Sequence, residues 1–167
     1  MKERQITAFI KEYRPEELPV EYLELTEAAK AATLRAHAPY SRFHVGAAIL
    51  MENGEIVSGA NQENAAFSSG TCAERSACFY TASAFPGMAM RRIAIAAYAE
   101  QDQQGNPDSP QEVKFQRLPI SPCGSCRQSL LEYETLYGPI EVVLYGADAV
   151  YLLPSVKSLL PLCFTEF

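Results

Sequence analysis

The alternation of apolar and polar positions predicts a chain of mixed helices and strands. Residues 21–37 are rich in Ala, Leu and Glu and follow Pro19, a pattern typical of an amphipathic helix. Residues 44–60 contain two apolar runs around Asn53-Gly54 and predict a hairpin. The Asn-Gly pair favours a type I′ turn, because both residues tolerate positive φ angles.

Two further helices are predicted, each beginning at a cysteine. Residues 72–84 form the first, and the spacing of its apolar residues indicates one buried face: Ala73, Ala77, Tyr80 and Ala84. Residues 123–133 form the second, which should end at Gly138-Pro139. A short helix at 155–160 is expected near the end of the chain.

Short apolar runs predict the remaining strands at 91–99, 140–146 and 149–154. The polar stretch 101–120 is interpreted as an inserted loop, unusually long for a compact domain. The element order α-β-β-α-β-α-β-β-α predicts an α/β fold with one mixed five-stranded sheet and helices on both faces. We expect a single domain over residues 1–167, with 1–18 as an N-terminal extension.

Charge and cysteine content narrow the classes of function. The net charge is −6 and no run of Lys or Arg occurs, which disfavours a nucleic acid polymer as partner. No apolar stretch reaches membrane-spanning length and the first residues do not resemble a signal peptide, so we expect a cytoplasmic protein without membrane contact. Five cysteines in such a chain make a disulfide framework improbable and leave metal binding, catalysis or burial.

Three of these cysteines have a pattern that favours a zinc site. Cys123 and Cys126 are three residues apart at the start of one predicted helix, and Cys72 begins another. The N–H groups and partial positive charge of a helix N-terminus favour thiolates. Three thiolates around Zn²⁺ with a free fourth position are typical of a catalytic rather than a structural site.

Glu74 follows Cys72 by two residues and has a possible role beside such a site. Zinc can lower the pKa of bound water to about 7, and a nearby carboxylate can carry the released proton without binding the metal. In one alternative, Glu74 is a solvated acid in the first helical turn and the three cysteines are simply buried. In another, Cys123 and Cys126 form a redox pair. A redox pair would not predict Cys-Ala-Glu upstream.

The ordered segments "YSRFHVGAA", "GANQENAAF", "CAERSA", "SPCGSCRQSLLEY" and "LLPLCF" resemble the cytidine deaminase family, of the homotetrameric three-cysteine zinc type. The resemblance spans about residues 40–164. It implies an α/β/α sandwich that binds one Zn²⁺ per subunit and hydrolyses cytidine and 2′-deoxycytidine to uridine and 2′-deoxyuridine with release of ammonia, as in pyrimidine salvage. It also implies a homotetramer in which neighbouring subunits share active sites.

The resemblance assigns roles to individual residues. It makes Cys72, Cys123 and Cys126 the zinc ligands and Glu74 the catalytic proton carrier, and it implies these substrate-binding residues: Phe43, Asn61, Glu63, Ala73 and Phe164. Arg75 has a separate physical rationale, because three thiolates on Zn²⁺ leave a net charge of −1 that a guanidinium donating to sulfur would offset. Gln128 is a further candidate for a residue that orients the zinc ligands without binding the metal itself.

Two departures from the family pattern leave questions open. Phe67 stands where relatives often have Tyr, and the 101–120 loop is longer than theirs; it either covers the pocket, alters a subunit interface or does neither. One alternative function is deamination of another cytosine-like nucleoside, such as a nucleoside antibiotic. The other is a non-catalytic, zinc-stabilised binding module, against which Glu74 and the free fourth position argue.

Overall fold

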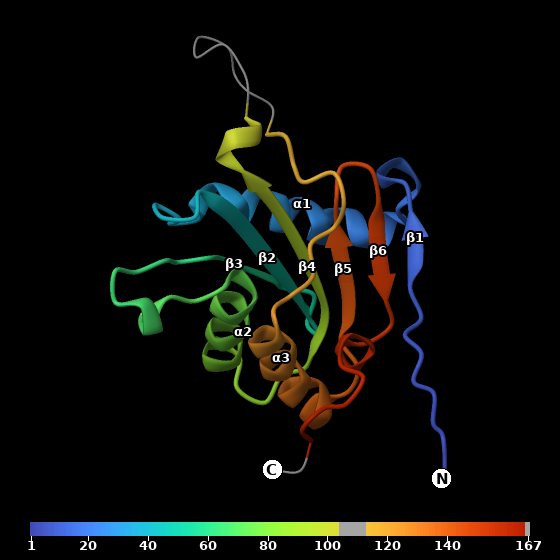
Figure 1. The fold of residues 1–167 in the computed structure, drawn as a ribbon. Helices are drawn as coiled ribbons and strands as arrows, with labels where there is room; N and C mark the ends of the chain where they lie inside the picture. The colour runs from blue at the N-terminus through green and yellow to red at the C-terminus, as the bar shows by residue number, and fades with distance from the viewer. Residues whose placement is uncertain (104–112, 166–167) are drawn as a thin grey trace.

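The centre of the computed structural model is a six-stranded sheet (Figure 1). The structure describes residues 1–103 and 113–165. The strands are β1 (Lys11–Tyr13), β2 (Phe43–Met51), β3 (Ile56–Ala60), β4 (Met90–Ala99), β5 (Glu141–Tyr145) and β6 (Val150–Leu153), in the order β1-β6-β5-β4-β2-β3. Only β4 and β5 are parallel among these neighbours. The predicted mixed sheet is confirmed.

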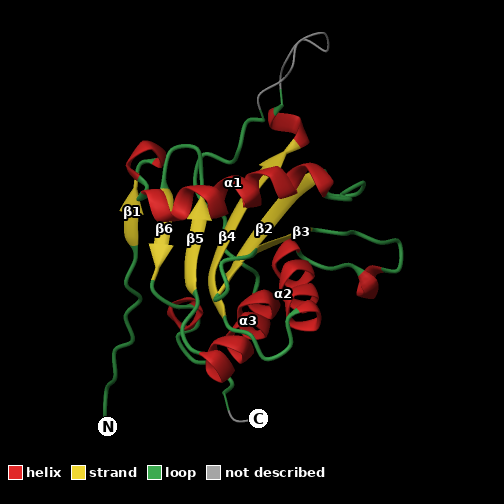
Figure 2. Cartoon of the chain, turned by 180° about the vertical axis from the view of Figure 1, so that it is seen from behind, coloured by secondary structure: helices red, strands yellow, loops and turns green. Residues whose placement is uncertain are grey.

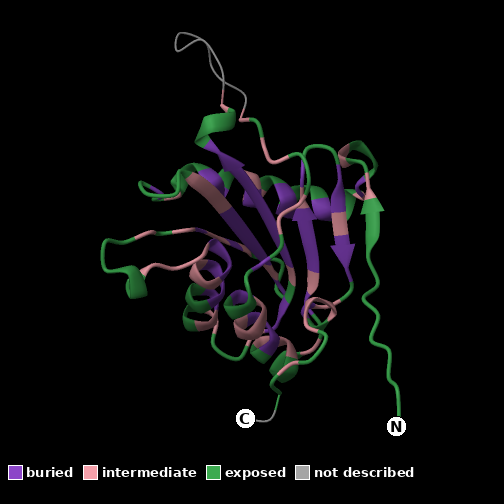
Figure 3. Ribbon diagram, viewed as in Figure 1, coloured by how far each residue is buried: buried purple, intermediate pink, exposed green. Residues whose placement is uncertain are grey.

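The prediction of five strands was wrong, because the segment taken as an extension supplies a sixth. β1 pairs with the outer edge of β6, with Lys11 opposite Leu152 and Tyr13 opposite Val150. The sequence KEY carries no apolar alternation, since β1 is an edge strand in which Lys11 and Glu12 are exposed and Tyr13 packs partly buried against the core (Figure 3). Its pairing is made by the backbone, which leaves little trace in the side-chain pattern.

Three helices cover the two faces of the sheet (Figure 2). α1 (Leu23–Ala32) lies on one face, and α2 (Ala73–Ala84) and α3 (Gly124–Tyr137) lie on the other. The predicted three-layer arrangement is confirmed. α1 is shorter than predicted because residues 20–22 and 33–35 form 3₁₀ turns, and the helix expected at 155–160 is the 3₁₀ turn Val156–Leu159.

Two local predictions were wrong. A type I′ turn needs positive φ at both central residues; Gly54 has φ 89°, but Arg42 is the only non-glycine residue with positive φ in the described segments. Instead, the Asn53 side chain accepts a hydrogen bond from Glu55 N at 3.1 Å in a wider connection. In α2, Tyr80 is 64% exposed, because the buried face is rotated toward Cys78 and Thr81.

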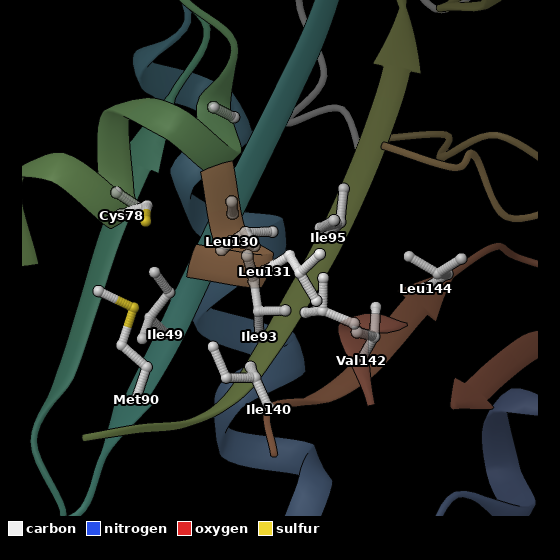
Figure 4. Packing of buried hydrophobic residues seen from close by; sticks show 14 of the residues in the cluster. Ile49, Cys78, Met90, Ile93, Ile95, Leu130, Leu131, Ile140, Val142 and Leu144 are labelled. Carbon is white, nitrogen blue, oxygen red and sulfur yellow. The ribbon is translucent and has the colours of Figure 1, made fainter. Parts of the chain in front are cut away.

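Side chains alternate between two hydrophobic cores along the central strands. On β4, Ile93 and Ile95 face α2 and α3, where they pack with large aliphatic residues of α3 (Figure 4). The intervening Ala94 and Ala96 face α1. The small residues let α1 lie close to the sheet, and at Gly46 an added Cβ would overlap backbone atoms of α1.

The predicted 101–120 loop is described only in part, since residues 104–112 lie outside the described residues. The returning segment crosses the ends of β4 and β5, where Gln116 N donates to Ala97 O (2.9 Å) and Gln116 O accepts from Ala147 N (2.8 Å). The Phe115 ring packs edge-on against Tyr98 and Tyr145. This part of the loop is therefore fixed on the sheet.

No helix in the described segments has the length and apolarity needed to cross a membrane.

Candidate metal centre and active site

The three predicted cysteine ligands meet where α2 and α3 begin. Cys72 and Cys123 are the N-cap residues of the two helices, and Cys126 lies in the first turn of α3. The Sγ atoms of Cys72 and Cys123 are 4.0 Å apart, those of Cys123 and Cys126 are 3.5 Å apart, and all three lie within 4.8 Å of one another. Tetrahedral Zn²⁺ with Zn–S bonds of about 2.3 Å places sulfurs about 3.8 Å apart. The thiols therefore fit one zinc ion.

The same distances exclude a disulfide, whose sulfurs lie about 2.05 Å apart. Among the described residues, the potential metal-binding group has only these three members, and Glu74 is not one of them. A zinc ion held here would keep one position free of protein, as in catalytic sites. The three thiols come together as a result of the fold, because strands of one sheet lead into both helices.

Charges around the thiols favour metal binding. The pKa of Cys72 is lowered to about 5, chiefly by hydrogen bonding from Cys126 and further by Arg75 and Cys123. The same interaction with Cys72 raises the pKa of Cys126. Arg75 Nη2 lies 4.0 Å from Cys72 Sγ, and this contact raises the pKa of Arg75. It is the guanidinium–sulfur contact expected from the sequence.

Glu74 combines burial with access to a pocket. Its side chain is in the first turn of α2 and only 4% exposed, yet it lines a cavity of about 400 Å³ together with Cys72 and Cys123. Burial raises the pKa of Glu74, and the charge of Cys72 raises it further. A carboxyl group with a raised pKa beside a metal centre can both accept and return a proton.

The pocket contains several of the other predicted residues but not all of them. Asn61, Glu63 and Ala73 line it, whereas Phe43 and Phe164 are not among its lining residues. Phe43 begins β2, and Phe164 is 64% exposed near the end of the chain. The proposed contacts of these two aromatic residues with a pyrimidine stay predictions.

Backbone contacts orient Asn61 and Glu63 toward this pocket. Asn61 Oδ1 accepts from Val45 N (2.8 Å) and Asn61 Nδ2 donates to Phe43 O (2.9 Å). Glu63 Oε2 accepts from Tyr40 N (2.9 Å) and Ser41 N (3.3 Å). The hydroxyl of Ser41 and then these backbone groups lower the pKa of Glu63. The Glu63 carboxylate is thus held in place through its Oε2 atom, which accepts both backbone hydrogen bonds.

Sequence reasoning missed part of the pocket wall. Nine lining residues were not predicted to bind substrate or metal: Tyr40, Val45, Gln62, Asn64, Phe67, Gly70, Thr71, Ile120 and Ser121. Alternation along β2 could have identified Val45, which lies on the same side as Phe43. Ile120 and Ser121 directly precede Cys123, so their place beside the metal centre was also accessible from the sequence.

Comparison with known proteins agrees with this geometry. Residues 20–137 match the family described as the cytidine and deoxycytidylate deaminase zinc-binding region. The chain belongs to this deaminase family. It is 35% identical to a cytidine deaminase from Sporosarcina psychrophila, over 86% of this chain and 90% of that protein. A probable cytidine deaminase from Dictyostelium discoideum is 34% identical over 84% of this chain and 81% of its own length.

Solved structures of cytidine deaminases share the fold. The crystal structure of the Burkholderia pseudomallei protein superimposes with a TM-score of 0.67 at 38% sequence identity, covering 86% of this chain and 98% of that chain. The Mycobacterium tuberculosis protein gives a TM-score of 0.64 at 27% identity, over 89% and 100% of the two chains. Together with the three thiols, the family's zinc-binding region identifies Zn²⁺ as the cofactor of this enzyme.

Proposed function

We propose that this enzyme hydrolyses cytidine and 2′-deoxycytidine to uridine and 2′-deoxyuridine, releasing ammonia. The observation that carries the proposal is the meeting, in one pocket, of a three-thiol zinc group with a buried carboxyl that does not belong to it. A site that used zinc only for folding would have a fourth protein ligand and no need of the acid. The relatives named above are cytidine deaminases, so neither the antibiotic deaminase nor the binding module is favoured.

Glu74 is proposed to move the protons of this reaction. When bound to the three thiolates, Zn²⁺ supplies the Lewis acidity that makes water nucleophilic near neutral pH. Glu74 accepts one proton from the water that attacks C4 and delivers it to ring N3. It then carries the second proton to the amino group, which leaves as ammonia while the C4 oxygen becomes the uracil carbonyl. Burial of Glu74 supports this role, because it raises the pKa of the carboxyl and so makes it a better proton acceptor.

The neighbouring residues are proposed to bind and orient the nucleoside. Asn61 and Glu63 hydrogen-bond the sugar hydroxyls, the latter through the oxygen not used by the backbone of Tyr40 and Ser41. The backbone of Ala73 holds the base edge, and Phe43 packs on the pyrimidine. Arg75 offsets the negative charge of the thiolates.

The charge of the pocket supports a nucleoside rather than a nucleotide. Its charged lining residues in the described segments are the acids Glu63 and Glu74, and no Lys or Arg accompanies them. A 5′-phosphate entering such a pocket would meet like charge without a cation to pair with. Deoxycytidine monophosphate should therefore be a poor substrate.

We also propose a homotetramer with shared active sites in the cytoplasm. Its support is apolar surface without a covering element: Phe79 and Tyr80 of α2, Leu136 of α3 and Leu162 of the tail are 49%, 64%, 56% and 84% exposed. Phe67, in the 3₁₀ turn Phe67–Ser69 between β3 and α2, lines the pocket and is 87% exposed. Large apolar groups exposed on α2, α3, the tail and the pocket rim support burial of these surfaces in a subunit interface. The cytoplasmic location rests on cysteines that form no disulfide.

Ammonia release from a panel of substrates tests the proposal. The zinc-loaded enzyme should act on cytidine and deoxycytidine, and turn over cytosine and deoxycytidine monophosphate at least about a hundredfold less efficiently. Bound zinc without ammonia release from any nucleoside would instead indicate a binding module. Turnover of adenosine or guanine in place of cytidine would overturn the substrate assignment.

A further inference from the structure

Arg127, in the first turn of α3, joins three separate parts of the chain. Its Nε donates to Pro122 O at 2.7 Å, its Nη1 to Leu159 O at 2.7 Å and its Nη2 to Ser121 Oγ at 2.9 Å. The side chain is half-buried, and none of the ion pairs in the described segments includes it. A cation near a helix N-terminus is disfavoured by the helix dipole, so these contacts have to compensate for its position.

Pro122 O and Ser121 Oγ, the acceptors of Nε and Nη2, belong to a wall of the active-site pocket. Ile120 and Ser121 line the pocket, and Pro122 connects them to the ligand Cys123. Arg127 therefore fixes this wall relative to the metal group through two bonds made from the helix that also carries Cys126.

The opposite end of this wall is fixed independently. At Gly146, an added Cβ would lie 2.7 Å from Arg117 O, so the segment passes directly against the turn after β5. Phe115 packs between Tyr98 and Tyr145, and the Lys30 ammonium lies 5.3 Å from the centre of its ring. The 115–119 portion thus has its own attachment, and only the pocket end depends on Arg127.

The remaining acceptor belongs to the C-terminal segment. Leu159 O receives the Arg127 bond, and Phe164 O receives a bond of 2.8 Å from Nε2 of the next residue, Gln128. Two consecutive residues of α3 therefore hold the tail at points five residues apart. Among the side-chain hydrogen bonds of the described residues, those of Arg127 reach both the tail and the pocket wall.

We propose that Arg127 is a positioning residue for substrate binding, which fixes the Ile120–Ser121 wall and the C-terminal segment against the start of α3. The inference rests on the proposed deaminase function and names Arg127 as a residue that determines the affinity for the substrate. Because Arg127 reaches neither Glu74 nor the thiols, its loss should raise KM and leave kcat and zinc content nearly unchanged.

Arg127→Gln in the zinc-loaded enzyme tests this assignment, with Arg92→Gln as the matched control. Arg92 is also half-buried and donates to Glu141 Oε2 (2.6 Å) and Glu21 O (3.2 Å), but at the far end of the sheet. Both variants should lower the melting temperature by a few degrees. Only Arg127→Gln should raise KM for cytidine about tenfold, with kcat within about threefold and zinc near one per chain.

Two single-contact variants and a lysine variant sharpen the test. Ser121→Ala removes one bond to the wall, and Gln128→Ala removes only a bond to the tail, so each should raise KM less than Arg127→Gln does. Arg127→Lys keeps the charge but has one nitrogen, and should resemble Arg127→Gln if geometry decides. Full rescue by lysine, or an unchanged KM in Arg127→Gln with a lowered melting temperature, would overturn the assignment.

A second readout separates this inference from the proposed function. Carboxypeptidase should shorten the tail faster in Arg127→Gln than in wild type or Arg92→Gln, whatever the substrate is. Equal rates in all three proteins would count against the attachment of the tail. If wild type releases no ammonia from cytidine while the trimming rates differ as expected, the substrate assignment fails and the structural role of Arg127 remains.

Discussion

The two faces of the sheet are built differently. The face covered by α1 is lined by small residues, Ala48, Ala94 and Ala96, and at Gly46 the helix backbone lies directly against β2. The face covered by α2 and α3 is filled by large side chains such as Ile93 and Leu130 (Figure 4). α2 also lies close to the sheet at Gly59, where an added Cβ would lie 2.6 Å from Ala77 N, so the faces differ in the size of their side chains and in how many helices cover them.

Because of this difference, we expect the α1 face to contribute mainly to folding stability and the α2/α3 face also to carry the catalytic site. Helix N-termini on the α2/α3 face meet beyond the packed core, where Cys72, Cys123 and Glu74 line a pocket. A hollow of about 420 Å³ also lies on the α1 face, where Lys30 and Tyr145 line it, but no cysteine or acid is among its described lining residues. Changes on the α1 face should therefore alter the free energy of unfolding, while changes at the helix starts should alter zinc binding and turnover.

The largest expected effect is loss of zinc in Cys126→Ala. The substitution removes one of three thiolates, so zinc should fall from one per chain toward zero and activity should disappear, a loss of more than about 10⁴-fold. Cys78→Ala is the matched control, because both cysteines are fully buried but Cys78 lies outside the thiol group. Metal analysis of both proteins decides; retained zinc in Cys126→Ala would remove this cysteine from the site.

Discrimination between cytidine and free cytosine should be about 10³-fold in kcat/KM. A carboxylate and an amide that bind sugar hydroxyls are left unpaired when the sugar is absent, which is unfavourable. Glu63→Ala should narrow this ratio by slowing cytidine turnover while leaving cytosine nearly unchanged. Steady-state kinetics on both substrates provide the measurement, and a ratio unaltered by Glu63→Ala would argue against sugar binding at this residue.

Gly46→Ala tests the close approach on the α1 face. The new methyl group would overlap the Ala29 carbonyl, so the free energy of unfolding should fall by about 1–3 kcal/mol or more. Gly124→Ala makes the same change at the start of α3, where nothing lies within 4 Å of the added Cβ, and should be nearly neutral for stability. Denaturant unfolding of the two variants compares a position packed against a helix with an open position; equal destabilisation would contradict the close approach of α1 to β2.

The smallest effect is expected for Phe164→Ala. A base–aromatic contact from this residue of a neighbouring subunit would contribute about 1–3 kcal/mol, so KM should rise tenfold or more with zinc retained. Removal of residues 162–167 should also weaken the oligomer, which sedimentation can follow. Unchanged KM together with an unchanged tetramer would contradict a shared pocket.

Local patterns were sufficient to predict much of the architecture. Hydrophobic periodicity identified the three helices and the five strands from β2 to β6, because buried faces impose their period on the sequence. The cysteines and Glu74 were predicted correctly as neighbours, since helix starts that follow strands of one sheet come together. β1 was missed because an edge strand held by backbone bonds needs no apolar alternation.

Features that depend on tertiary contacts could not be predicted in this way. Tyr80 has the spacing of a core residue but is exposed, because the sheet contacts α2 along a rotated face. The acceptors of Arg127 lie up to 32 residues away along the chain, beyond any local signal. Side chains that orient a site through distant backbone groups are visible only in the folded structure.

Glu74→Gln is the most direct test of the central claim that a buried acid beside the zinc group carries the protons. The amide keeps the size of the side chain but cannot accept a proton, so ammonia release should fall by roughly 10³–10⁴-fold, the upper part of the range for general acid–base catalysis. Zinc content near one per chain and an unchanged melting temperature would show that the site is otherwise intact. Wild-type zinc content combined with activity within tenfold of wild type would contradict the account.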